Sequence, residues 1–87
     1  MLHCRYSIIK VDGQSTIIVE VQRAVFTTMQ KKVAVTNFFR SFLKGVAIVL
    51  LCYDGQAQPL FYGQQNIIAK LKLINLATIN WHNIIIN

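Results

Sequence analysis

Acidic residues are nearly absent from this chain. Of its 87 residues, only Asp12, Glu20 and Asp54 carry a negative side chain. Acid–base catalysis of the glycosidase type needs a pair of carboxylates, and both aspartates precede a glycine, which is typical of tight turns. Glu20 lies in a strand-like stretch, where we expect it to pair with a nearby cation. The sequence therefore predicts a binding protein rather than an enzyme.

Cysteine and glycine are scarce as well. Cys4 and Cys52 are too few and too far apart for a disulfide framework; a bridge between their strands is compatible with the pattern but not required, and we expect reduced thiols. His3 and His82 do not form the close ligand pairs with cysteine that structural zinc sites use. The four glycines are isolated, so the chain has no glycine-rich phosphate loop. We expect no metal, no cofactor and no small-molecule substrate.

Long hydrophobic runs are also missing. The strongest apolar stretch, residues 45–53, has less than half the length of a membrane-spanning helix. The first residues lack the apolar segment of a secretory signal. We therefore expect a cytoplasmic protein with no membrane partner.

Positive charge and apolar side chains are what this chain has in excess. Nine lysines and arginines give a net charge of +6, which meets the electrostatic criterion for a nucleic-acid-binding protein, although the same charge would also keep an apolar surface soluble. Apolar residues make up 54% of the chain, against roughly 45–50% in soluble domains. A domain this small cannot bury them all, and a second copy is the commonest partner for such a surface. We expect a homodimer, or another protein as partner.

Turn signals and apolar periods predict one small α+β domain over residues 1–87, with the element order ββαββαβ. We expect a mainly antiparallel sheet with both helices packed on one face. The predicted strands are 5–11, 15–22, 46–53, 60–62 and 81–86, and the predicted helices lie within 23–45 and 66–74.

Local signals support these elements. Asp12-Gly13 favours a type I′ hairpin turn, and Asp54-Gly55 is a second turn signal. Thr27 or Thr28 can cap the first helix, and Lys44-Gly45 supplies its end. Asn66 can cap the second helix. The apolar run 46–53 predicts a central strand covered on both faces, whereas Pro59 places the strand after it at an edge.

Two sets of residues are candidate binding sites. The first set would contact nucleic acid through cations on the first helix, with Asn37 on the same face, and on the second helix. Its members are Lys31, Lys32, Arg40, Lys44, Lys70 and Lys72. The segment 44–51 has the lysine and glycine of an RNA-recognition motif but lacks the aromatic residues that stack on bases, so that module is excluded.

The second set would form a protein interface. Aromatic residues on an edge strand and near the C-terminal strand combine apolar area with a polar group, and an uncovered final strand should pair with another chain. The members of this set are Phe61, Tyr62, Trp81, Ile84 and Ile86. Phe38, Phe39 and Phe42 form a helical stripe that we expect in the core. We predict a non-enzymatic protein-interaction module of the adaptor or inhibitor type, with nucleic-acid binding through the first helix as the alternative.

Overall fold

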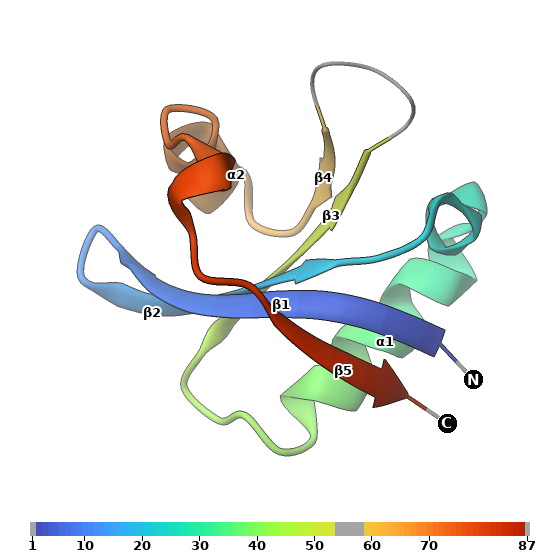
Figure 1. Ribbon diagram of the computed structural model, residues 1–87. Helices are drawn as coiled ribbons and strands as arrows, with labels where there is room; N and C mark the ends of the chain where they lie inside the picture. Colours follow the sequence, from blue (N-terminus) through green and yellow to red (C-terminus); the bar gives the residue numbers. More distant parts are fainter. Residues whose placement is uncertain (1, 54–58, 87) are drawn as a thin grey trace.

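The computed structural model describes residues 2–53 and 59–86 (Figure 1). Within these ranges, five strands, two α-helices and two short 3-10 helices follow one another. They are β1 (Leu2–Val11), β2 (Gln14–Glu20), η1 (Arg23–Thr27), α1 (Met29–Arg40), β3 (Ala47–Cys52), β4 (Leu60–Tyr62), α2 (Gln65–Leu71), η2 (Leu76–Thr78) and β5 (His82–Ile86). The predicted α+β class and order of strands and α-helices are confirmed; the turn predicted at Asp54-Gly55 lies outside the described residues.

The strands form one mixed sheet in the order β4-β3-β2-β1-β5. Only β2 and β3 pair in parallel, and the other three pairs are antiparallel. The parallel pair arises because the chain crosses from β2 to β3 through η1 and α1, whereas a tight turn would have reversed its direction. The predicted mainly antiparallel sheet and the edge position of β4 after Pro59 are confirmed.

The β1–β2 hairpin follows its turn signal. Asp12 and Gly13 have φ angles of 53° and 79°, and a type I′ turn requires positive φ at both central residues. The turn joins Val11 to Gln14, the last pair of the β1–β2 ladder. The predicted hairpin is confirmed.

Helix boundaries were predicted with mixed success. The Thr28 hydroxyl accepts a hydrogen bond from the Lys31 amide at 3.1 Å, which confirms Thr28 as the cap of α1. The predicted end at Lys44-Gly45 is wrong, because α1 stops at Arg40, and the Ser41 hydroxyl donates to the Phe38 carbonyl at 2.7 Å. The predicted cap at Asn66 is also wrong: α2 has already begun at Gln65.

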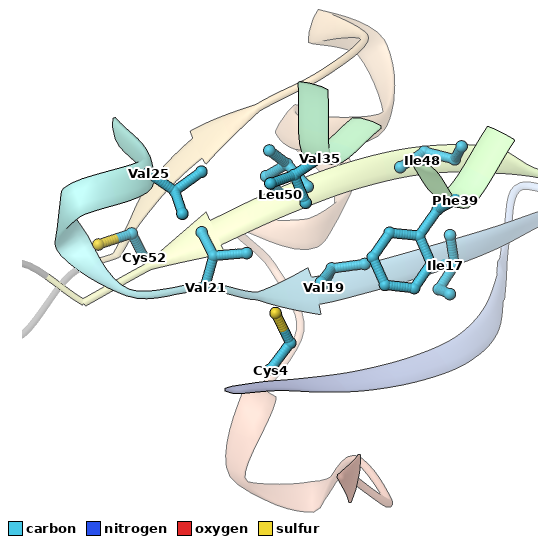
Figure 2. Packing of buried hydrophobic residues seen from close by; sticks show 10 residues of the cluster. All are labelled: Cys4, Ile17, Val19, Val21, Val25, Val35, Phe39, Ile48, Leu50 and Cys52. Carbon is cyan, nitrogen blue, oxygen red and sulfur yellow. The ribbon is translucent and has the colours of Figure 1, made fainter. Parts of the chain in front are cut away.

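Two buried clusters lie on opposite faces of the sheet. The α1-side cluster, drawn in Figure 2, consists of Cys4, Ile17, Val19, Val21, Val25, Val35, Phe39, Ile48, Leu50 and Cys52. The α2-side cluster consists of Val11, Ile18, Val49, Leu51, Ile67, Ile68 and Leu71. Because consecutive strand residues point to opposite faces, β2 and β3 contribute side chains to both clusters.

The prediction that both helices pack on one face is therefore wrong. Helix α1 covers one face and α2 covers the other (Figure 1). The physical reason is the continuous apolar run of β3, which is buried on both sides and needs a cover on each.

Both cysteines are buried. Cys4 lies on β1 and Cys52 on β3, with β2 between them. Two strand spacings amount to about 9–10 Å, whereas a disulfide needs Cα atoms within about 7 Å. Burial also raises the pKa of the Cys4 thiol. The strand order therefore argues against a disulfide between Cys4 and Cys52.

Gly63 lets the chain turn from β4 to α2 directly against β3. An added Cβ would lie 3.1 Å from the Ile48 carbonyl oxygen and 3.1 Å from Cγ2 of Val49. We expect Gly63→Ala to lower the free energy of unfolding by about 1–3 kcal/mol, because the crowded atoms belong to a central strand. Urea unfolding would measure the loss. Gln64→Ala, at an exposed neighbour, should change little, and equal effects of the two substitutions would contradict this account.

Candidate functional site

The aromatic residues of the predicted protein interface lie apart. Phe61 and Tyr62 are consecutive on β4, so Phe61 packs on the α2-side cluster and Tyr62 on the α1-side cluster. Trp81 is half-buried against the α2-side cluster, and its Nε1 donates to the Leu76 carbonyl at 3.2 Å. Each of these side chains thus has an intramolecular packing role, and they do not form a common surface.

Strand β5 lies at the opposite edge of the sheet from β4. Ile84 is half-buried against the α1-side cluster, whereas Ile85 points to the other face and is 54% exposed. Ile86 pairs through its backbone with Leu2, and its side chain lies outside the described residues. Among the described strands, β5 pairs with β1 alone, so its outer edge is open to pairing with another chain.

The β5 edge has none of the strongly charged side chains. The sequence contains no Asp, Glu, Lys or Arg after Lys72, and β5 contributes His82, Asn83 and three isoleucines. Natural edge strands are blunted by charge, proline or shortness. The β4 edge has the last two of these features, because it is three residues long and follows Pro59. Strand β5 is five residues long and has neither charge nor proline.

The charge nearest to β5 in the sheet is already neutralised. Arg5, which pairs with Asn83 of β5, donates from Nε and Nη2 to the Glu20 carboxylate at 2.7 and 2.9 Å, as expected for Glu20. These hydrogen bonds raise the pKa of Arg5. The guanidinium also lies 5.0 Å from the centre of the Trp81 ring. The one lysine or arginine of β1 within the β1–β5 ladder is therefore paired with a carboxylate.

The Arg5 cluster gives a modest stability prediction. We expect Arg5→Ala to lower the free energy of unfolding by about 0.5–1 kcal/mol, the usual value of an exposed ion pair with good geometry. Chemical denaturation followed by Trp81 fluorescence would measure the change. Lys10→Ala removes another exposed cation of β1 and should change the value by less than about 0.5 kcal/mol; a larger loss for Lys10→Ala would contradict the role given to Arg5.

The six predicted cations fall into three places. Lys31 and Lys32 lie in the first turn of α1, and Lys32 Nζ is 5.2 Å from the centre of the Tyr62 ring and 5.6 Å from that of Phe26. Lys70 and Lys72 lie on α2 and its C-cap, across the sheet from α1. Lys70 Nζ is 3.7 Å from the Asp12 carboxylate. The six residues do not form one surface.

Arg40 and Lys44, by contrast, line one hollow. It lies between the loop that follows α1 and the loop that precedes α2, and it is open to solvent. Gln14 and Gln64 contribute amides to its wall. An adjoining hollow shares Arg40 and Gln64 and adds Tyr62. The described residues of both walls include no carboxylate.

The phenylalanine stripe is only partly core. Phe39 is 1% exposed, as expected, whereas Phe38 and Phe42 are 37% and 55% exposed. Val35 and Phe39 are four residues apart on α1 and face the sheet, whereas Phe38 lies on the next row of the helix and Phe42 lies in the turn after α1 ends. All three rings stay in contact, with centroids 5.3–5.8 Å apart.

The histidines and cysteines do not converge in the described part of the chain. Within residues 2–53 and 59–86, no three His, Cys, Asp or Glu side chains are grouped so that they could hold a metal ion. His82 lies against the Tyr6 ring, with centroids 5.4 Å apart. In those same ranges, no helix combines the length and apolar character that crossing a membrane requires.

Several residues of these surfaces were missed by the sequence patterns. Gln14 and Gln64 reach the hollow from a hairpin and a loop far apart in sequence, and Ile85 becomes the exposed apolar residue of the β5 edge. An uncharged final strand is a signal in the sequence for the edge, but nothing local indicates the hollow. Comparison of the chain with protein-family models, with curated proteins and with solved structures found no match.

Proposed function

We propose that this chain is a small protein-binding module that acts as a homodimer, with β5 pairing antiparallel to β5 of a second copy. The observation that carries the proposal is the edge position of β5 together with its composition: the strand contains no Asp, Glu, Lys, Arg or proline that would hinder pairing. Pairing would join two five-stranded sheets into one, with main-chain hydrogen bonds supplying affinity and the isoleucine side chains packing across the joint.

A second copy suits this edge better than an unrelated partner. Two chains that each carry a net charge of +6 repel one another over most of their surfaces. We expect that repulsion to be weak at the β5 edge, because Arg5 is paired with Glu20 and β5 contains no Asp, Glu, Lys or Arg. A two-fold axis places the same patch on both subunits, and an uncharged strand is complementary to itself.

Catalysis has no part in the proposal. Cys4 and Cys52 are buried on strands that are too far apart for a disulfide between them, which suits a reducing compartment such as the cytoplasm; we include that compartment in the proposal. An adaptor or inhibitor role would use the surfaces that remain free in the dimer, among them the exposed rings of Phe38 on α1 and Phe42 just after it.

Sedimentation equilibrium over a concentration series tests the homodimer. A five-residue strand pair is a small interface, so we expect micromolar association, with a mass near twice the 9.9 kDa of one chain at high concentration and dissociation on dilution. Added salt should leave the association unchanged or strengthen it slightly, because the joint has no ion pair and screening reduces repulsion. A monomer at every concentration up to several hundred micromolar would refute the proposal.

A further inference from the structure

We infer that the side of α1 that faces β4, with the hollow below it, binds the phosphate backbone of a nucleic acid through Arg40 and Lys44. The hollow lies where β2 and β3 begin and includes no residue of β5, so the inference is independent of the homodimer. Of the six cations predicted to bind nucleic acid, only Arg40 and Lys44 line this hollow.

The charges of this hollow are not neutralised by described neighbours. Arg40 Nη1 lies 3.4 Å from the Asn37 side-chain oxygen, an uncharged acceptor. Arg40 and Lys44 are exposed and face one open space. Asp12 lines a neighbouring hollow with Gln14 and Gln64, but its carboxylate lies beside Lys70. Two cations without an opposing carboxylate favour an anion.

The wall of the hollow is held in place by its own hydrogen bonds. Gln14 Nε2 donates to the Gly45 carbonyl at 3.1 Å, which ties the hairpin of β1 and β2 to the loop after α1. Gly45 has a φ of 73°, the left-handed conformation that lets this loop turn back toward β3. The hydrogen bond to Gly45 therefore holds the loop that contains Lys44 against the start of β2, and Lys44 lines the hollow together with Arg40, the last residue of α1.

A third cation continues the site along the helix. Lys32 and Arg40 are eight residues apart on α1, two steps along one i, i+4 row. Both lie beside Tyr62: Lys32 Nζ is 5.2 Å from the ring centre, and Arg40 lines a hollow with Tyr62. The two residues are about 12 Å apart along the helix axis, so the row suits successive phosphates of a chain. The half-buried Tyr62 ring thus lines a hollow with Arg40 and contacts Lys32, which brings an aromatic side chain to the same site.

The shape of the hollow favours a polymer over a small metabolite. It has a volume of about 510 Å³ and is open to solvent, with an adjoining hollow of about 400 Å³ that shares four wall residues. Sites for small molecules enclose most of their ligand. An open basic surface with amide and aromatic side chains is typical of contacts to a nucleic-acid backbone.

Fluorescence anisotropy with labelled single-stranded and duplex oligonucleotides tests the inference. The variant Arg40→Gln/Lys44→Gln removes both cations of the hollow, and the matched control Lys70→Gln/Lys72→Gln removes the same charge from the opposite face. We expect the first variant to weaken binding at least tenfold and the control less than threefold. The salt dependence of duplex binding should become less steep by about 1.8 in log–log slope, or 0.9 for each lost phosphate contact.

Three results would overturn the inference. One is the absence of oligonucleotide binding by the native chain at low salt. Another is an equal loss of oligonucleotide affinity in both variants, which would show that binding depends on the net charge of the chain and not on this hollow. The third is full displacement of the oligonucleotide by millimolar inorganic phosphate, which would assign the hollow to free phosphate. Circular dichroism of both variants confirms that they are folded, which we expect because all four substituted side chains are exposed.

Discussion

Phe39→Ala is expected to lower the free energy of unfolding by about 3–5 kcal/mol, the range observed for buried phenylalanine. The Phe39 side chain is 1% exposed and packs between α1 and the sheet, toward Ile17 and Val19 (Figure 2). A domain of 87 residues has about 4–13 kcal/mol in total, so this loss would remove a large fraction of its stability. Guanidinium unfolding followed by circular dichroism would measure the change.

Phe38→Ala and Phe42→Ala are the matched controls for Phe39. Both positions carry the same side chain in contact with the Phe39 ring, but they are 37% and 55% exposed. We expect each to cost about 1 kcal/mol, mainly through the lost aromatic contact. If either control destabilised the chain as much as Phe39→Ala, the assignment of Phe39 alone to the core would be wrong.

Ile85→Lys is expected to raise the dissociation constant of the homodimer at least tenfold, equivalent to about 1.4 kcal/mol. Ile85 is 54% exposed on the β5 edge, so the isolated chain should tolerate lysine with a change in unfolding free energy below about 0.5 kcal/mol. In the dimer, both copies would bring an ammonium group to the joint, where it must be desolvated beside its like-charged counterpart. Sedimentation equilibrium would measure the shift.

Leu73→Lys separates this effect from overall charge. Leu73 is 82% exposed in the segment between α2 and η2, so the substitution adds the same charge away from β5. The dissociation constant should change less than twofold. An equal rise for both variants would show that repulsion between whole subunits, rather than the β5 joint, controls association.

Features governed by neighbouring residues were predictable from the sequence. The hairpin at Asp12-Gly13 follows from two residues that tolerate positive φ, and the start of α1 follows from the Thr28 hydroxyl. The edge position of β4 follows from Pro59. Proline has no backbone N–H to donate to a neighbouring strand, so it is typical of edge strands. In each case the physical cause lies within a few residues of the feature.

Features that depend on distant parts of the chain were not predictable in the same way. The placement of α1 and α2 on opposite faces depends on strand order, although the two-sided apolar run of β3 already required a cover on each face. The hollow joins Gln14, Arg40 and Gln64 from three separate segments. Sequence spacing alone does not bring such residues together, so only the two cations of the hollow were found beforehand.

Amide hydrogen exchange of β5 at two protein concentrations tests the central claim most directly. Amides of residues 82–86 that point toward β1 are protected in either state, because β1 and β5 pair along that side. Amides on the outer side become protected only when another strand covers them. We predict slow exchange of the outer amides at high concentration and fast exchange after dilution below the dissociation constant. Fast exchange of the outer amides at both concentrations would contradict pairing of β5 with a second copy.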